Sequence, residues 1–388
     1  MRAYLDYNAT SPLTAEVVQA VARALAEQFG NASSVHFFGQ RAKAALDESR
    51  QAVASLIGAE PSEVVFTAGG TESDNFALRG VAEVLESGRR RELVVSAIEH
   101  EAVLQTAKAL ARRGWRVVHL PVTTDGLVTA DALRAALSPE TAFVSIMHAN
   151  NETGVVQPVA ALAALARQAG ALVHTDAVQT VGKLPVDVRE LGVDLLSLSG
   201  HKFGAPKGTG ALWIRRGTRL APLLTGGRHE RSRRAGTENV PALIGLGVAA
   251  AQVKAHLPAE ASRLSSLRDR LELQILESVP DTTVNGGAAP RVPNTTNISF
   301  DRVEAESLLI ALDLEGIAVS TGAACSSGTL EPSHVLRAMR LPQGRTQNAI
   351  RFSLGSGTTK EEVDRVCAVL PPLVEKLRAL MRMPAGVR

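Results

Sequence analysis

Short apolar runs alternate with amphipathic stretches between about residues 63 and 215. A run such as 193–198 lacks polar alternation, which is typical of a parallel strand buried on both faces. Strands are predicted over residues 64–67, 93–98, 115–121, 142–147, 171–176, 193–198 and 210–215. Helices are predicted over 72–85, from about 100 to 113, and over 130–137. This alternation predicts βαβ units in a mainly parallel sheet, the pattern of an α/β protein.

The pattern differs at both ends of the chain. Helical spacing predicts helices over 15–29 and 39–57, joined by a turn-rich linker, and a mostly helical stretch over 240–279. An α+β pattern follows, with strands over 295–300, 317–320 and 349–354 and helices over 304–314, 332–339 and 359–380. Pro371 and Pro372 are expected to kink or split the last helix. The predicted units are an N-terminal segment (1–14) that packs with the small domain, a large domain (15–255) and a smaller C-terminal domain (256–388).

Composition agrees with an ordinary globular protein. The 388 residues are 45% hydrophobic and 21% charged, and 42 basic against 39 acidic residues leave a net charge of +3. This near balance disfavours nucleic-acid binding. The N-terminus has no apolar signal region, and the longest apolar run, 240–251, is shorter than the roughly 20 residues a membrane helix needs, so a cytoplasmic protein is expected. Two cysteines without a C-x-x-C pattern suggest neither a disulfide framework nor a structural zinc site.

Two neighbouring candidate residues follow predicted buried strands. Lys202 comes directly after the run 193–198, and Asp176 ends the run 171–176. Ligands of open α/β sheets bind beyond the carboxyl ends of the strands, so this lysine can form a Schiff base with an aldehyde cofactor. The carboxylate is what the ring nitrogen of pyridoxal phosphate (PLP) requires. Alternatively, Lys202 is an ordinary surface lysine and Asp176 is a helix N-cap. The occurrence of both residues at strand ends favours the cofactor site over these alternatives.

Three further features suit a cofactor site. Gly70 and Thr71 form a glycine-rich turn at a helix start, where free backbone N–H groups bind phosphate, although a simple capped turn gives the same pattern. His100 follows a strand and can stack on a flat cofactor or shuttle protons; the alternative is an exposed residue at a helix start. Arg351, inside an apolar strand, suits a carboxylate clamp, unless it is only an edge-strand arginine.

The two cysteines and the loop 226–237 need separate interpretations. Cys325 lies in a loop of small residues and is the candidate reactive thiol, whereas Cys367 falls on the apolar face of a helix and is expected to be buried and inert. The glycine-flanked loop 226–237 carries four arginines without interleaved aromatic residues, so phosphate or subunit contacts are favoured over nucleic acid. A solvated charge run remains the alternative.

Eight short motifs occur in order along the chain, namely LDYNAT (5–10), TESDN (71–75), NNE (150–152), HTDAVQ (174–179), SGHK (199–202), RAGT (234–237), ACSSGTLEP (324–332) and RFSL (351–354). Taken together, they resemble the cysteine desulfurases, PLP enzymes of the class-V aminotransferase-like group with the aspartate aminotransferase fold. The resemblance covers nearly the whole chain. It implies fold type I of PLP-dependent transferases.

The resemblance also implies a role for each candidate. Lys202 would carry PLP, Asp176 would pair with its ring nitrogen, His100 would stack on the ring and Gln179 would bond the phenolate oxygen. Gly70, Thr71, Ser199 and His201 would hold the phosphate, and Thr237 would reach the phosphate in the partner subunit. Asn8, Asn151 and Arg351 would bind the substrate, with Asn151 also touching the cofactor. Cys325 would accept sulfur. No metal site is expected from the protein alone, and Cys325 is the one candidate ligand of a shared iron–sulfur cluster.

The implied reaction converts L-cysteine to L-alanine and a persulfide on Cys325. The substrate amine displaces Lys202, the freed lysine removes the Cα proton, the Cys325 thiolate attacks the substrate sulfur, and His100 assists reprotonation. The implied partners are a second copy of the chain in a homodimer and an iron–sulfur cluster scaffold or another sulfur acceptor, with neither membrane nor nucleic acid. Selenocysteine lyase, cysteine sulfinate desulfinase and a non-catalytic PLP-fold regulator are the alternatives. Ala32 and Arg228 depart from the family pattern, as does the short C-terminus, and these departures leave the acceptor open.

Overall fold

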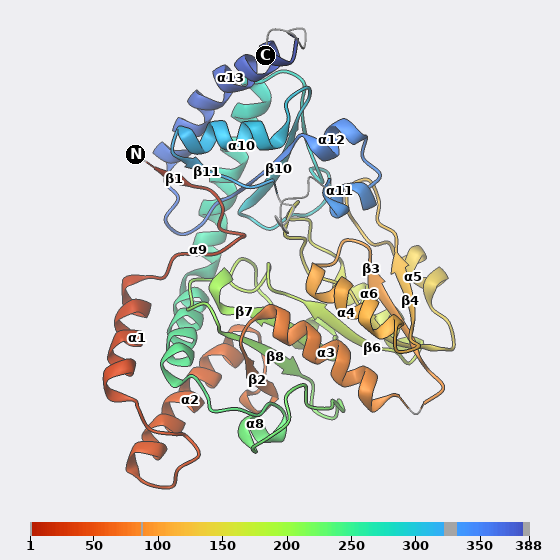
Figure 1. Cartoon of the computed structure of the whole chain (residues 1–388), viewed down its shortest axis with the longest axis vertical. Coiled ribbons are helices and arrows are strands. Elements are labelled where there is room, and N and C mark those ends of the chain that lie inside the picture. The colour runs from red at the N-terminus through yellow and green to blue at the C-terminus, as the bar shows by residue number, and fades with distance from the viewer. Residues whose placement is uncertain (1, 87, 322–331, 383–388) are drawn as a thin grey trace.

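A computed structural model describes residues 2–86, 88–321 and 332–382, and a seven-stranded sheet forms the centre of its larger part (Figure 1). The strand order is β2-β8-β7-β6-β5-β3-β4. The strands are β2 (Val64–Thr67), β3 (Glu92–Ser96), β4 (Arg116–Leu120), β5 (Thr141–Ser145), β6 (Leu172–Asp176), β7 (Leu195–Ser199) and β8 (Gly210–Ile214). Only β8 runs antiparallel to its neighbours, β2 and β7. The predicted α/β class with a mainly parallel sheet is confirmed.

Both faces of this sheet are covered, which explains why its strands are apolar throughout. Successive residues of β7 enter different cores, since Leu195 packs in one hydrophobic cluster and Leu196 in another. The connecting helices are α3 (Gly70–Val84), α4 (Glu101–Ala111), α5 (Ala130–Ala136), α6 (Val159–Gln168) and α7 (Val188–Leu191). Because helices link the parallel strands, the carboxyl ends of β5, β6 and β7 meet at one sheet edge.

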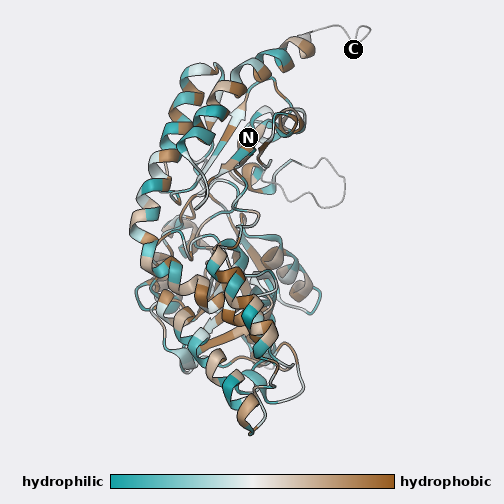
Figure 2. Ribbon diagram, turned by 90° about the vertical axis from the view of Figure 1, so that its left-hand side faces the viewer, coloured by the Kyte–Doolittle hydropathy of each residue, from teal (hydrophilic) through white to brown (hydrophobic). Residues whose placement is uncertain are grey.

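One long helix joins the two parts of the molecule. α9 (Val240–Ser278) packs at its start against α1 (Ala15–Glu27) and α2 (Phe37–Leu56), and its later residues enter the second core (Figures 1 and 2). It is the one helix of the described residues long and apolar enough to cross a membrane, but half of its most apolar window is buried within the protein. Burial against α1 and α2 accounts for that apolar character.

The C-terminal part contains a small antiparallel sheet with the order β12-β10-β9 and a two-stranded parallel pair of β1 and β11. The strands are β1 (Ala3–Tyr4), β9 (Thr282–Val284), β10 (Thr295–Phe300), β11 (Ile317–Ala318) and β12 (Ala349–Ser353). The helices are α10 (Ala305–Leu314), α11 (His334–Ala338), α12 (Gln343–Gln347) and α13 (Lys360–Arg382). The pairing of β1 with β11 attaches the N-terminal segment to this part of the chain.

Two details of the helices differ from the sequence predictions. Pro371 and Pro372 lie inside α13, which continues through them as one helix, so of the two expected outcomes, a kink or a split, the split is wrong. The buried Val363, Leu370 and Val374 hold this helix on the second core, and that packing outweighs the backbone hydrogen bonds lost at two prolines. Among the described residues, four helices were not predicted, namely α6, α7, α12 and α8 (His229–Ser232).

Candidate active site

Lys202 lies in a single 3-10 turn, η2 (Gly200–Lys202), directly beyond the carboxyl end of β7. Its Nζ donates hydrogen bonds to the backbone carbonyl oxygens of Asn8 at 2.6 Å and Ala9 at 2.9 Å. Burial lowers the pKa of Lys202 to about 8, and the positive charge of Arg351 adds to the effect. An amine with this pKa is partly neutral near physiological pH and is therefore a competent nucleophile.

Asp176 ends β6, the strand that pairs with β7, and its side chain is buried. Its Oδ1 accepts a hydrogen bond from the backbone N–H of Val178 at 2.8 Å. Burial raises the pKa of this carboxyl, while His100, the Val178 N–H and Lys202 oppose the rise. A buried carboxylate in this position is stabilised by any cation placed against it.

The glycine-rich turn between β2 and α3 has little room for side chains. A Cβ on Gly70 would lie 2.7 Å from Cγ2 of Val178, and a Cβ on Gly69 would lie 3.6 Å from Oγ of Ser199. Gly69 also has a φ of 149°, which disfavours other residues. The first N–H groups of α3 thus open beside the Ser199 hydroxyl, and Thr71 lies exposed in the first turn.

The two histidines of the predicted site have different surroundings. His100 is the N-cap of α4, where its Nδ1 accepts from the Ala102 N–H at 3.1 Å, and it is exposed. His100 is therefore an exposed residue at a helix start, as the alternative interpretation expected. Its exposed ring is also accessible to a ligand. His201 Nδ1 lies 3.2 Å from Oγ1 of Thr10, and burial lowers its pKa to about 4. His201 is consequently neutral near pH 7.

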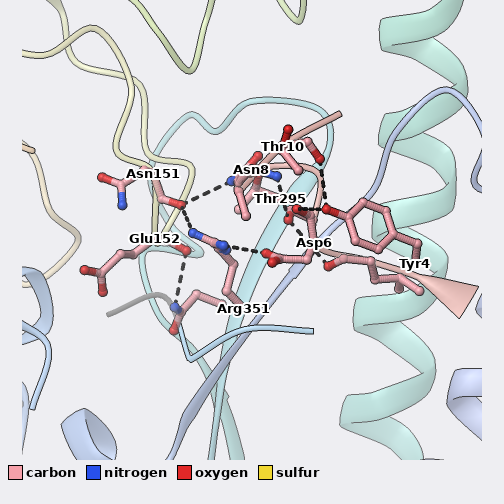
Figure 3. A network of polar contacts seen from close by, with 12 residues as sticks. Tyr4, Asp6, Asn8, Thr10, Asn151, Glu152, Thr295 and Arg351 are labelled. Atoms are coloured by element: carbon pink, nitrogen blue, oxygen red, sulfur yellow. Dashed lines mark hydrogen bonds and ion pairs between the residues drawn. The ribbon is translucent and has the colours of Figure 1, made fainter. Parts of the chain in front are cut away.

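Arg351 lies in the middle of β12 with its guanidinium directed at the N-terminal segment (Figure 3). One terminal nitrogen pairs with Oδ1 of Asp6 at 2.6 Å, and the other donates to the backbone oxygen of Asn151 at 2.9 Å. Its Nε is buried without a partner among the described residues. Arg351 does lie on an edge strand of the small sheet, but its guanidinium is buried and paired with Asp6 and Asn151, and it retains donors for a carboxylate.

Asn8 connects this arginine to the cofactor candidates. Its Nδ2 donates to Oγ1 of Thr295 at 2.9 Å and to the backbone oxygen of Asn151 at 3.2 Å (Figure 3). Its own backbone oxygen accepts from Lys202 and, at 3.2 Å, from Nε2 of the buried Gln179. The structure therefore brings Asn8, Asn151, Gln179, Lys202 and Arg351 into one network.

Sequence reasoning missed several members of this site. Asp6 belongs to the LDYNAT motif but was given no role, yet it is the ion-pair partner of Arg351. Asp74 and Glu99 were not singled out, but burial, together with the nearby Asp176, raises the pKa of both carboxyls well above their ordinary values. In the sequence, Asp74 and Glu99 are marked only by their position, Asp74 shortly after a glycine-rich turn and Glu99 directly after a strand.

Thr237 and Cys325 are two predicted residues that the described structure does not bring to this network. Thr237 is exposed in the loop before α9, and in the described part of the chain no hydrogen bond joins it to the residues around Lys202. Cys325 lies outside the described residues. The described neighbours of its segment do reach the site, since Ser320 exchanges backbone hydrogen bonds with Arg351, and His334 Nε2 lies 2.9 Å from the backbone oxygen of Glu99. Among the residues described, no group of three His, Cys, Asp or Glu side chains is arranged to hold a metal.

The residues present fit PLP. The Lys202 amine suits its aldehyde, and Asp176 is a buried carboxyl whose raised pKa a protonated ring nitrogen would lower. The α3 N-terminus, where Gly70 leaves no room for a Cβ, suits its phosphate. Three different requirements of one molecule are met at a single sheet edge.

Comparisons with known proteins agree with this chemistry. The family model described as Aminotransferase class-V matches residues 3–366. A cysteine desulfurase of Gluconacetobacter diazotrophicus is 52% identical over 97% of this chain and 94% of its own length, and the cysteine desulfurase IscS of Dictyoglomus turgidum is 48% identical over 97% and 95%. A solved structure titled NifS-like protein superposes with a TM-score of 0.88 at 36% identity, covering 98% of this chain and 99% of its own.

These matches confirm the fold type and the resemblance inferred from the sequence motifs. Members of this family depend on PLP, the cofactor that the site fits. The chain belongs to the class-V aminotransferase family, within its cysteine desulfurase group.

Proposed function

We propose that this chain is a PLP-dependent cysteine desulfurase that converts L-cysteine to L-alanine and passes the sulfur onward as a persulfide. The observation that carries the proposal is the pair of Lys202, an amine with a pKa of about 8, and Asp176, a buried carboxyl, at the ends of adjoining strands. Relatives named cysteine desulfurase along nearly the full chain support the same activity. Their names do not favour selenocysteine lyase, cysteine sulfinate desulfinase or a non-catalytic regulator.

When bound, PLP supplies an electron sink for the carbon atoms of the substrate. Lys202 would hold the cofactor through its amine and, when free, would take the proton from the substrate Cα. Asp176 would stabilise a positive charge on the ring nitrogen, His100 would stack on the ring and assist proton return, and Gln179 would donate to the ring oxygen. Gly70, Thr71, Ser199 and His201 would hold the phosphate.

The residues around Arg351 would orient the substrate. The guanidinium retains donors besides those used by Asp6 and Asn151, and these hold the substrate carboxylate, with Asn151 and Asn8 at its side. The thiolate of Cys325 attacks the substrate sulfur. The carbon–sulfur bond breaks with its electrons remaining on carbon, which then takes up a proton to give alanine.

The decisive assay measures alanine and sulfide from L-cysteine in the presence of a dithiol reductant. The PLP-loaded protein is expected to release both, whereas Cys325→Ala should retain bound PLP and form neither persulfide nor sulfide. Mass spectrometry after exposure to cysteine should locate a +32 Da adduct, one sulfur atom, on Cys325. A loaded protein that yields no alanine would refute the proposal, as would full activity in Cys325→Ala.

The proposal includes a homodimer in which Thr237 serves the phosphate of the partner subunit. Support comes from apolar side chains exposed on and between α1 and α2, where the Phe29 and Phe37 rings contact Phe38 and Val35 is 91% exposed. Such a surface is typical of an interface with another protein. Light scattering of the active protein should give the mass of a dimer, and a monomer mass would contradict this part of the proposal.

The remaining finer assignments also belong to this proposal. The acceptor is an iron–sulfur cluster scaffold or another sulfur carrier, reached through Cys325, which is also the one candidate metal ligand through a shared cluster. The protein works in the cytoplasm, apart from membranes and nucleic acid. Residues 15–255 form the cofactor-binding domain, and residues 256–388, joined by segment 1–14, form the smaller one. Pull-down of acceptor proteins from persulfide-loaded enzyme, with Cys325→Ala as the control, tests the partner.

A further inference from the structure

A second lysine, Lys183, is buried beside the predicted cofactor residues. The chain reaches it through a tight turn after β6, in which Gly182 has a φ of 86° and lies so close to Phe203 that a Cβ would be 2.6 Å away. This turn directs the Lys183 side chain inward, where the residue is only 7% exposed. A buried lysine is unusual enough to require an explanation from its contacts.

The Nζ of Lys183 makes two short hydrogen bonds, to Oε1 of Gln179 at 2.6 Å and to Oδ1 of Asn8 at 2.7 Å. Burial lowers the pKa of Lys183 well below its ordinary value, and the positive charges of Lys202 and Arg351, the charged groups that face it, lower it further. The two amide oxygens give the buried amine a hydrogen-bond acceptor on each of two sides, so it is not left without partners.

These contacts help to determine which way the Gln179 amide faces, whereas the Asn8 amide is also oriented by Nδ2 of Asn294, which donates to the same Oδ1 at 3.1 Å. The oxygen and nitrogen ends of an amide have nearly the same shape, and only hydrogen bonding distinguishes them. Because the Lys183 amine donates to both amides, it favours their oxygen ends in front of it. The Nε2 of Gln179 is therefore turned the other way, where it donates to the backbone oxygen of Asn8, the atom that also accepts from Lys202.

We propose that Lys183 is a positioning residue that fixes the Gln179 amide with its N–H groups toward the ring oxygen of the cofactor. The inference rests on the proposed function, in which Gln179 donates to that oxygen. Without Lys183, Oε1 of Gln179 loses its donor, and the Asn8 carbonyl at 3.2 Å is the remaining contact among the described residues that orients the amide. The Asn8 side chain loses one contact but keeps those to Asn294, Thr295 and Asn151. The effect is therefore expected at Gln179.

The test uses the visible absorption of the PLP-loaded protein as pH is varied. A donor at the ring oxygen stabilises the form in which the nitrogen linking Lys202 to the cofactor has lost its proton, because that form carries more negative charge on the oxygen. Lys183→Met should therefore raise the midpoint of the absorption change by about one pH unit, as expected for one lost hydrogen bond to a charged group. Gln179→Leu should raise it by a similar amount.

The double variant Lys183→Met/Gln179→Leu distinguishes positioning from a direct electrostatic effect. If Lys183 acts through Gln179, the double variant has the midpoint of Gln179→Leu alone. A further upward shift in the double variant would show an independent charge effect and overturn the inference. An unchanged midpoint in Lys183→Met beside a shifted one in Gln179→Leu would also overturn it, while no shift in Gln179→Leu would instead remove the proposed role of Gln179.

As a control for folding, the melting temperature and the PLP content of each variant are measured. If Lys183→Met does not fold, Lys183→Gln keeps a polar group of similar reach but can present an oxygen as well as an N–H, so it no longer fixes the Gln179 amide. The same upward shift is expected in that variant, and a wild-type midpoint there would contradict the inference.

Discussion

The two walls of the site are constructed differently. One, the sheet-edge wall, consists of Asp176, Ser199 and Lys202, which end adjoining strands of the large sheet. The other, the N-terminal wall, consists of Asp6, Asn8 and Arg351, and its central ion pair joins residues 345 positions apart in the chain. The first wall follows from the topology of parallel strands, whereas the second exists only after the two ends of the chain have come together.

The difference predicts separate functions. Under the proposed function, the sheet-edge wall bears the groups that hold and activate the cofactor, so substitutions there should abolish the chemistry. The N-terminal wall would bind the substrate carboxylate through the guanidinium of Arg351, and its backbone oxygens accept from the Lys202 amine. Substitutions in the N-terminal wall should therefore weaken substrate binding more than they slow the chemical step.

The largest effect is expected from Lys202→Ala in the sheet-edge wall. Loss of the amine removes both the covalent link to PLP and the base that takes the Cα proton, so kcat should fall by more than about a thousandfold. Alanine production measures this loss. Retention of PLP by non-covalent contacts, followed by gel filtration, separates loss of chemistry from loss of cofactor. Activity near that of the unmodified protein would place the reactive amine elsewhere.

The N-terminal wall is tested by Arg351→Gln. A lost charge-assisted hydrogen bond to a carboxylate is worth about 1.5–3 kcal/mol, so KM for L-cysteine should rise roughly 10- to 100-fold, with a smaller change in kcat. Asp6→Asn is the matched control, because it keeps the guanidinium and removes only its anionic partner. A KM that changes in Asp6→Asn but not in Arg351→Gln would assign carboxylate binding to another residue.

The two walls also differ in how far the sequence predicted them. Asp176 and Lys202 were found because an apolar run that ends in a polar residue marks a strand end, and strand ends of parallel sheets converge. The alternation of strands and helices around them was predicted for the same reason. These signals are local, and each needs only a short window of sequence.

No local signal marks the N-terminal wall as a unit. Arg351 was noticed as a charged residue in an apolar strand, and Asn8 only through the resemblance, but nothing in either segment shows that Asp6 is the ion-pair partner. Lys183 was missed because its burial depends on the turn at Gly182 and on Asn8 arriving from the other end of the chain. The continuity of α13 through Pro371 and Pro372 likewise depends on packing against the second core.

A smaller effect concerns the pH dependence of cofactor capture by the sheet-edge wall. Lys202 has a pKa of about 8, and only the neutral amine attacks the aldehyde. The neutral fraction rises with pH, so the rate at which PLP-free protein captures PLP should increase roughly tenfold between pH 7 and pH 9 and then level off. Stopped-flow absorbance measures this rate. A rise that continues steadily to pH 10 would indicate an unperturbed lysine instead.

The smallest effect is expected at Cys367, which belongs to neither wall. It lies on α13, packed partly against the second core, and is half-buried where the sequence predicted full burial. Burial raises the pKa of its thiol to about 11, so only about one molecule in a thousand carries the thiolate at pH 8. Cys367→Ala should therefore leave alanine production unchanged and lower the free energy of unfolding by about 1 kcal/mol or less, measured by urea denaturation. In the unmodified protein, iodoacetamide should label Cys325 well before Cys367, since the thiolate is the reactive form. A persulfide located on Cys367, or a desulfurase rate that falls in Cys367→Ala, would mean that sulfur transfer extends beyond the two walls to the outer face of the C-terminal helix.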